Sequence, residues 1–235
     1  MRKIAMLKQI VFDFDGTLAD TVEMCLDVYL RVLGKYMGDA VPSREEVYAS
    51  FGKNEPGILR MYLDDRAPAA LEEFCALHRE FHRTVCPEPF PGIRELLAEL
   101  RRRGAELAVV TGRCEATCRI SLDMLDLASF FPTLRFGSAE RNDKAAQLAA
   151  LVTSHGFAME ETVYVGDAVS DVLACREAGV RCLSAAWGSS ARRGELEAVN
   201  PGLVFPTVGA LREYLGERLP VPPSGGGVPA EGGSR

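Results

Sequence analysis

The sequence predicts an α/β protein, a doubly wound parallel sheet of Rossmann-like type with a small α-helical cap inserted after the first strand. Two observations lead to this prediction. Short apolar runs alternate with helical patterns along most of the chain, and one long stretch near the N-terminus is helical throughout. Strands that are buried on both faces read as continuous apolar runs, and strands that alternate with helices form parallel sheets.

The first predicted strand is the apolar run at residues 10–12, which ends in Asp13 and Asp15 with Gly16 directly behind them. Two carboxylates this close repel each other. The pair makes sense if a bound cation offsets the repulsion and the two acids have separate tasks. Glycine then lets the backbone turn away where a side chain would collide with the site.

The next segment has a different texture, with helical patterns and little strand signal. We expect helices at residues 22–35, 45–51, 58–64 and 69–84, followed by a proline-rich return at 87–91. Proline stiffens turns and stops helices, so this run marks a domain boundary. The predicted organisation is a core of residues 1–18 and 89–219, a cap of residues 19–88, and a disordered Pro/Gly/Ser-rich tail of residues 220–235.

Beyond the cap, strand-like and helical segments alternate regularly. The expected strands are residues 107–110, 162–165, 180–183 and 203–205, and the expected helices are residues 93–103, 115–125, 144–155, 169–178 and 208–215. In open α/β sheets the ligand crevice lies at the carboxyl ends of the strands.

Polar residues occupy those carboxyl ends. Thr111 follows one strand, Asp167 and Asp171 follow another, and Lys144 lies in the first turn of a helix. These residues should therefore meet the acid pair of the first strand at one edge of the sheet. Lys144 could supply positive charge beside these acids.

The chain resembles the haloacid dehalogenase superfamily, and within it the phosphoglycolate phosphatase-like enzymes. The resemblance spans nearly the whole chain apart from the tail. It rests on four motifs in the family order: Asp13-Phe14-Asp15-Gly16-Thr17-Leu18, Thr111-Gly112, Lys144, and Gly166-Asp167 with Ser170-Asp171. Two later features point to the same branch: Ala186-Trp187-Gly188, and the spacing of Leu196 from Asn200-Pro201.

The resemblance implies a covalent mechanism. Asp13 would attack phosphorus and form an aspartyl-phosphate. Asp15 would protonate the leaving alcohol and later remove a proton from the hydrolytic water. Lys144 would balance the negative charge, although many relatives follow this lysine with proline and here Ala145 follows it. Arg141 is the alternative for that role.

The resemblance also implies a Mg²⁺ ion, a hard cation that prefers oxygen ligands. The Asp13 carboxylate, the Asp15 backbone carbonyl and Asp167 would hold it, and Asp171 would ligate through water or orient the other ligands.

The phosphoryl oxygens need hydrogen-bond donors. By the same resemblance, Thr111 would donate its hydroxyl, and Phe14 and Gly112 would donate backbone N–H groups.

A cap loop at residues 50–57 is the candidate for substrate selection, because it combines two glycines, a proline and a cation. Lys53 and Asn54 could reach a carboxylate or a second phosphate on the substrate, with Arg113 helping from the core. The alternative is that Lys53 is an ordinary solvated lysine. Connecting loops on a rigid scaffold often carry function.

We therefore expect a Mg²⁺-dependent phosphomonoesterase that acts on a small phosphorylated metabolite, with phosphoglycolate as the leading substrate. The alternatives are a pyrophosphatase, or a sugar-phosphate phosphatase or phosphomutase of the same superfamily. A non-catalytic regulatory protein on this scaffold is less favoured, since such proteins usually lose Asp13 or Asp15.

Composition excludes some classes of protein. A net charge of −6 and a pI near 5.3 give no reason to expect nucleic-acid binding. The sequence has no apolar run of membrane-spanning length and no signal-peptide pattern, so we expect a cytoplasmic protein, either a monomer or a homodimer.

The cysteines and histidines suggest no metal centre. The seven cysteines are odd in number and lack Cys-x-x-Cys spacing, so we expect buried, reduced thiols. His78 and His82 share a helical face, but zinc would need further ligands, and we expect them on a solvated cap surface.

Overall fold

The computed structural model describes residues 6–220, so the predicted tail lies outside the described residues apart from Pro220. Within that part of the chain the core is a single parallel sheet of six strands in the order β3-β2-β1-β4-β5-β6. The strands are β1 (Gln9–Phe12), β2 (Glu106–Val110), β3 (Thr133–Arg135), β4 (Thr162–Gly166), β5 (Arg181–Ala185) and β6 (Val204–Phe205). This order confirms the predicted fold class.

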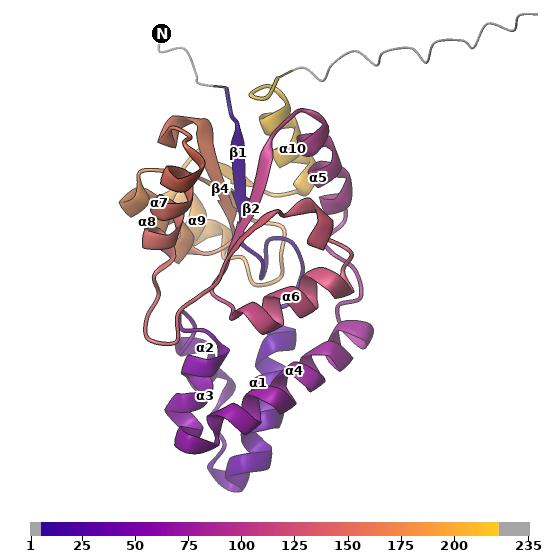
Figure 1. The fold of residues 1–235 in the computed structure, drawn as a ribbon, viewed down its shortest axis with the longest axis vertical. Coiled ribbons are helices and arrows are strands. Elements are labelled where there is room, and N and C mark those ends of the chain that lie inside the picture. The colour runs from indigo at the N-terminus through magenta and orange to yellow at the C-terminus, as the bar shows by residue number, and fades with distance from the viewer. Residues whose placement is uncertain (1–5, 221–235) are drawn as a thin grey trace, which may run out of the picture.

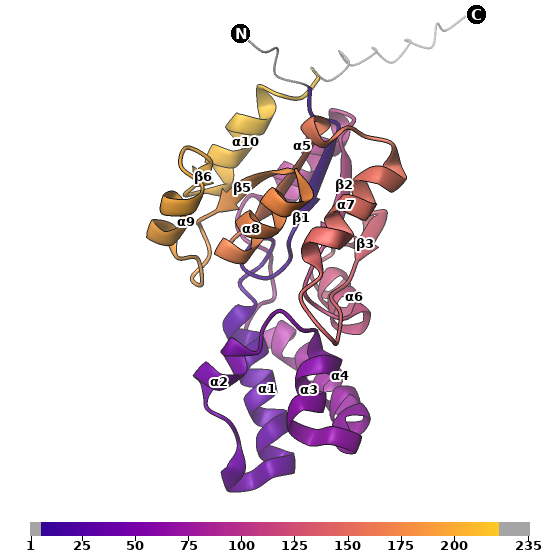
Figure 2. The same ribbon diagram turned by 90° about the vertical axis from the view of Figure 1, so that its left-hand side faces the viewer.

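Helices cover both faces of the sheet (Figures 1 and 2). They are α5 (Ile93–Arg102), α6 (Glu115–Met124), α7 (Lys144–His155), α8 (Val169–Ala178), α9 (Arg193–Val199) and α10 (Val208–Gly216). On one face α5, α6 and α10 bury a large apolar cluster, and on the other α7, α8 and α9 bury a second.

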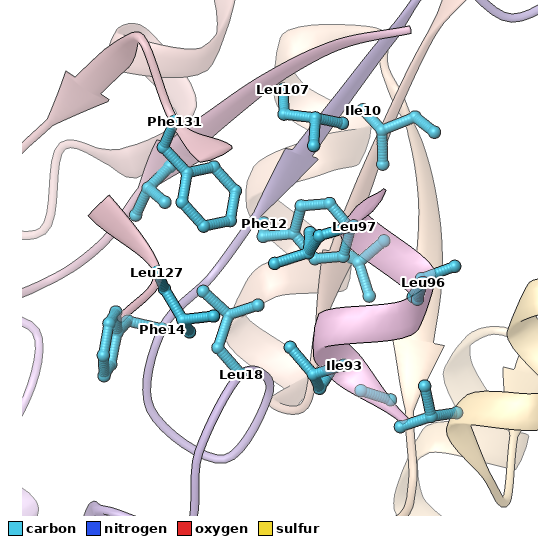
Figure 3. Close-up of a cluster of buried hydrophobic side chains, with 14 of the residues drawn as sticks. Ile10, Phe12, Phe14, Leu18, Ile93, Leu96, Leu97, Leu107, Leu127 and Phe131 are labelled. Atoms are coloured by element: carbon cyan, nitrogen blue, oxygen red, sulfur yellow. The ribbon is translucent and has the colours of Figure 1, made fainter. Parts of the chain in front are cut away.

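Strand β1 is the centre of the sheet and is buried on both faces. Ile10 and Phe12 belong to the larger cluster together with Leu97 of α5 (Figure 3), while Val11 belongs to the opposite cluster. Full burial of a side chain such as Phe12 stabilises the fold by roughly 1.5–3 kcal/mol. The buried middle of the sheet therefore fixes the position of the loop that follows β1.

Four helices form a separate layer beyond the carboxyl ends of the strands (Figures 1 and 2). We call residues 19–88 the cap, after its predicted extent. Its helices are α1 (Val22–Met37), α2 (Arg44–Ala49), α3 (Glu55–Leu63) and α4 (Ala67–Thr84). The cap has its own apolar core, in which Tyr29 of α1 packs against Phe74 of α4 with ring centroids 4.6 Å apart.

Short 3-10 turns join several of these elements, at Gly38–Ala40, Asp64–Arg66, Ala128–Phe130 and Met159–Glu161. Six of the seven cysteines are buried, as expected, and Cys75 is half-buried. Within residues 6–220, none of the helices is both long enough and apolar enough to cross a membrane.

One expectation about the cap is wrong. His78 and His82 do not lie on a solvated surface, since both side chains are fully buried where α4 packs against α6. The Nε2 atoms of both rings lie within hydrogen-bond distance of the hydroxyl of Ser121 on α6. Ser121 lies about forty residues away in sequence. The sequence of α4 by itself therefore gave no sign of this partner, and its polar histidines were expected to face solvent.

Candidate active site

The ends of β1, β2 and β4 bring the predicted residues together. The backbone N–H of Asp13 donates to the carbonyl of Val165 at 2.8 Å, which continues the β1–β4 pairing one residue past the strand. Asp167 follows β4 directly, and Thr111 follows β2. Parallel strands in register place these three side chains at one edge of the sheet.

Lys144 lies between two carboxylates. Its Nζ donates to Asp13 Oδ2 at 2.9 Å and to Asp171 Oδ1 at 2.6 Å, and only a tenth of its side chain is exposed. Asn142 supports the first turn of α7, because its Oδ1 accepts from the backbone N–H of Lys144 at 3.2 Å. The charges of Asp13 and Asp171 outweigh burial and raise the pKa of Lys144, so it remains protonated.

Asp171 is fixed from several sides. Its Oδ2 accepts from the backbone N–H of Ala168 at 3.0 Å, which helps to cap α8, and its Oδ1 lies 3.5 Å from the hydroxyl of Tyr164. With Lys144 on the same carboxylate and no exposed surface, the Asp171 side chain is held in a fixed orientation.

Asp13, Asp167 and Asp171 form a cluster that could hold a metal ion, with one carboxylate oxygen of each within 4.8 Å of the others. If all three carboxylates are ionised, the single ammonium of Lys144 leaves two negative charges without a partner in a buried place. Burial, and then the charges of Asp171 and Asp13, raise the pKa of Asp167 well above its usual range. A divalent cation would relieve this repulsion.

Gly16 is needed for this cluster to form. Its backbone has φ +69°, a left-handed conformation that favours glycine, and a Cβ there would lie 2.1 Å from Asp167 Oδ2. Ser190 approaches the same oxygen and donates its hydroxyl at 3.0 Å.

Asp15 faces a different set of groups. Arg113 donates through Nε to Oδ2 at 2.8 Å and through Nη2 to Oδ1 at 2.5 Å, and Thr21 donates its hydroxyl to Oδ1 at 2.6 Å. Burial by itself would raise the pKa of Asp15, but the Arg113 guanidinium outweighs it and lowers that pKa to about 2.

The predicted phosphoryl-binding groups lie beside these acids. The N–H of Phe14 points to the Asp13 carboxylate, with 2.8 Å between N and Oδ1. Thr111 is buried, and its Oγ1 accepts from the backbone N–H of Arg113 at 3.3 Å. Gly112 lines the cavity above Asp13, a space of about 310 Å³ between core and cap.

The cap loop reaches the site, but its polar residues differ in what they contact. Lys53 lines a second, smaller cavity of about 80 Å³ together with Asp15 and Arg113, and its Nζ lies 3.4 Å from the sulfur of Met61. Asn54 instead caps α3, accepting from Gly57 N at 3.1 Å through its Oδ1.

Asn54 also links the cap to the core, since its Nδ2 donates to the carbonyl of Gly137 at 2.7 Å. Both the Oδ1 and the Nδ2 atom of its side-chain amide are thus hydrogen-bonded to protein atoms. Arg113 is occupied in the same way, so the substrate contacts predicted for these two residues compete with protein partners in this structure.

A sequence model of the family described as "Haloacid dehalogenase-like hydrolase" matches residues 10–185, which include every strand end described above except that of β6. The chain belongs to the haloacid dehalogenase-like hydrolases.

Curated and solved relatives agree with this assignment. A phosphoglycolate phosphatase of Pseudomonas savastanoi pv. phaseolicola is 30% identical over 213 residues, covering 84% of this chain and 76% of that protein. Among solved structures, a hydrolase from Pseudomonas syringae superposes with a TM-score of 0.71 at 21% identity, covering 91% of this chain and 99% of that one. CbbY from Rhodobacter sphaeroides, solved in complex with phosphate, gives 0.65 at 24% identity and covers 77% of this chain and 86% of that one.

These findings confirm the resemblance read from the motifs, and they make this haloacid dehalogenase-like hydrolase a phosphatase. The solved structures, all below 25% identity, support the fold alone.

Sequence reasoning missed several residues around the site of this hydrolase. Glu55 of α3 is almost fully buried and accepts from Cys114 N at 2.6 Å and from the Thr117 hydroxyl at 2.5 Å. Ser190 and Ser121 were missed as well, and a lone serine in a loop or helix gives no signal. The buried His78 and His82 did give one, because they continue the four-residue spacing of Ala70 and Phe74 along one face of α4.

Proposed function

We propose that this phosphatase hydrolyses a small phosphate monoester in two steps, with Asp13 as the nucleophile and Mg²⁺ as the bound metal. The observation that carries the proposal is the position of Asp13 at a strand end, in contact with Lys144 and within 4.8 Å of Asp167 and Asp171. Phosphoryl transfer depends mainly on positioning and charge stabilisation, which this arrangement supplies.

In the first step, a carboxylate oxygen of Asp13 attacks phosphorus and forms a new P–O bond while the P–O bond to the alcohol breaks. The electron pair of that bond passes to the leaving oxygen, which takes a proton from Asp15. Lys144 lies 2.9 Å from the nucleophile and balances its charge. A positioned acid contributes a factor of about 10²–10⁴ to such a step.

In the second step, water attacks the phosphorus of the aspartyl-phosphate and gives a proton to the Asp15 carboxylate. The P–O bond to Asp13 breaks, its electron pair returns to that carboxylate, and inorganic phosphate leaves. Asp15 rests in the ionised form that this step requires, because Arg113 keeps its pKa low. The negative charge of an arriving ester favours the proton uptake needed for the first step.

The residues present fit Mg²⁺. The cluster offers hard oxygen ligands and carries excess negative charge, and its carboxylates lie close enough to share one ion. Asp13 and Asp167 would hold the ion with the Asp15 backbone carbonyl, and Asp171 would ligate through water or orient the others. When bound, Mg²⁺ supplies positive charge that stabilises the phosphoryl oxygens.

Burial of the cluster also bears on the nucleophile. Among protein groups alone, burial raises the pKa of Asp13 to about 7, with Lys144 opposing and Asp171 reinforcing the shift. The cation would therefore favour the ionised, nucleophilic form of Asp13 near neutral pH.

For the substrate we propose phosphoglycolate. The cavities above Asp13 and beside Asp15 measure about 310 and 80 Å³, which suits a small ester. Lys53 lines the smaller cavity, where its ammonium group would attract a carboxylate, and a relative 30% identical to this chain is named phosphoglycolate phosphatase. We propose that Thr111 and the N–H groups of Phe14 and Gly112 bind the phosphoryl oxygens.

The test is phosphate release from a panel of esters, with Mg²⁺ and with EDTA. The panel contains phosphoglycolate, pyrophosphate, sugar phosphates and nucleoside monophosphates, and Asp13→Asn is the blank. We expect metal-dependent turnover that is fastest on phosphoglycolate and absent from the variant. Faster release from pyrophosphate or a sugar phosphate would reassign the substrate, and near-wild-type hydrolysis by Asp13→Asn would refute the nucleophile.

A further inference from the structure

Arg113 is a buried charged group whose only part in the reaction described above is to keep Asp15 ionised. It follows the Thr111-Gly112 turn at the end of β2, its side chain is 4% exposed, and its guanidinium carbon lies 4.7 Å from the centre of the Phe14 ring. One edge of the guanidinium faces the catalytic cavity through Asp15. The other edge faces the junction of cap and core.

The guanidinium has few donors to spare for a substrate. Of its five N–H groups, two bind the carboxylate of Asp15, and Nη2 also contacts the sulfur of Cys25 at 3.2 Å. Nη1 donates to Ser121 Oγ at 2.6 Å and to His78 Nε2 at 2.9 Å. A substrate ligand in the resting state would be expected to keep donors free toward the cavity.

A directional hydrogen-bond chain holds the outer edge of Arg113. His82 Nδ1 lies 3.0 Å from the carbonyl of Cys86, which can only accept, so the ring's proton is on Nδ1. The other nitrogen, Nε2, then accepts from the Ser121 hydroxyl at 2.6 Å, and Ser121 Oγ in turn accepts from Arg113. Each member of the chain has a defined role as donor or acceptor, so the guanidinium plane is fixed.

The inner edge transmits this fixed position to Asp15. Two parallel N–H···O bonds match the fork of a guanidinium to the plane of a carboxylate, which adds geometric specificity to the attraction of charge. Thr21, at the start of α1, also donates to this carboxylate. An acid/base group must be held within about 0.5 Å of its working position to be effective.

We propose that Arg113 is a positioning residue for Asp15, and that the Ser121–His82 chain between core and cap sets the orientation of its guanidinium. The inference rests on the proposed function, because it assigns Arg113 a part in the proton transfer that Asp15 performs. It differs from a substrate-binding role, in which Arg113 would contact the ester and serve all esters alike.

The test compares two esters in single-turnover experiments on the full chain with Mg²⁺, following release of the leaving group. Glycolate needs a proton as it leaves phosphoglycolate, whereas p-nitrophenolate leaves p-nitrophenyl phosphate as a stable anion. With Arg113→Gln we expect glycolate release to slow by about 100-fold and nitrophenolate release by less than about 5-fold. Arg119→Gln, at an exposed arginine on the helix α6 that follows Arg113, is the control and should change neither rate.

Two further variants keep the test independent of folding defects. Ser121→Ala leaves the Arg113–Asp15 ion pair in place but removes the hydrogen bond that orients the guanidinium. It should therefore also slow glycolate release more than nitrophenolate release, with a loss on glycolate of about 10-fold, one tenth of that in Arg113→Gln. Asp15→Asn combined with Arg113→Gln should cleave phosphoglycolate no more slowly than Asp15→Asn alone. Thermal unfolding of each variant reports whether it is folded.

Equal losses on both esters would overturn the inference, as would additive losses in the double variant. If the wild-type protein cleaves neither ester with Mg²⁺, the proposed function fails and this inference fails with it. If the wild type cleaves both esters but Arg113→Gln slows both by the same factor, only the positioning role of Arg113 is overturned and the proposed function stands.

Discussion

Protonation of the buried histidines of α4 should make the protein less stable in mild acid. His82 is fully buried, and burial followed by the nearby charge of Arg113 lowers its pKa from an ordinary 6.5 to about 4, even though its hydrogen bond to Cys86 opposes the shift. The unfolded chain therefore takes up this proton first as the pH falls. Stability contributed by the neutral ring is complete above about pH 6.5 and is lost progressively towards pH 4.

The size of the effect follows from those two values. A full difference of 2.5 between them corresponds to about 3 kcal/mol, since each pKa unit is worth about 1.4 kcal/mol. The same relation gives about 2 kcal/mol at pH 5. His78, whose pKa burial and Arg113 also lower, adds to the loss in the same direction.

The assay is urea unfolding of the wild type and of His82→Gln at about pH 7.5 and about pH 5. Other titrating groups are common to both proteins, so the difference between their two pH responses isolates the ring. We expect the free energy of unfolding to fall by about 2 kcal/mol less in the variant than in the wild type. Arg79→Gln, an exposed change on the same helix, should respond like the wild type.

An equal fall in wild type and His82→Gln would refute the reasoning. It would mean that the ring of His82 takes up its proton as easily in the folded protein as in the unfolded chain. The expectation drawn from sequence, a solvated His82, would then be right.

Three further predictions test the site itself. Gly16→Ala places a Cβ 2.1 Å from Asp167 Oδ2 at φ +69°, and should raise the Mg²⁺ concentration for half-maximal activity by at least about 10-fold; an unchanged titration would contradict it. Lys144→Ala should lower kcat by at least about 100-fold, by the loss of a charge held ready for the transition state, while Arg141→Ala should do little, and the reverse pattern would move the role to Arg141. Lys53→Ala should lower kcat/KM for phosphoglycolate by about 10-fold and spare p-nitrophenyl phosphate, so equal losses would remove Lys53 from substrate selection.

Much of the fold could be predicted because its signals are local. The helices predicted at residues 144–155 and 169–178 have the observed bounds of α7 and α8, and the apolar run at 10–12 lies within β1. Strand β3 (Thr133–Arg135) was missed for a physical reason. It is a short edge strand whose three residues are all half-buried, so no continuous apolar run marks it.

The candidate site divides in the same way. Its acids and Lys144 could be predicted because each follows a strand or opens a helix, and a parallel sheet carries all such points to one edge. The partners of Asp15 could not, because Arg113 lies 98 residues away from it in sequence and orients towards it only after the sheet has formed. From the sequence we predicted that Arg113 would contact the substrate, whereas in the structure its guanidinium binds Asp15.

The joint between cap and core explains why those long-range partners belong together. Glu55 of the cap accepts from the N–H of Cys114 and from the hydroxyl of Thr117, so the cap supplies the carboxylate that satisfies the first turn of core helix α6. Helix N-termini have N–H groups without partners of their own, and a capping group there contributes about 0.5–2 kcal/mol. Arg113 directly precedes this turn, and His78 of the cap accepts from its other edge. The segment that orients Asp15 is therefore held on both sides by cap residues, so a seated cap and a correctly placed acid depend on the same contacts.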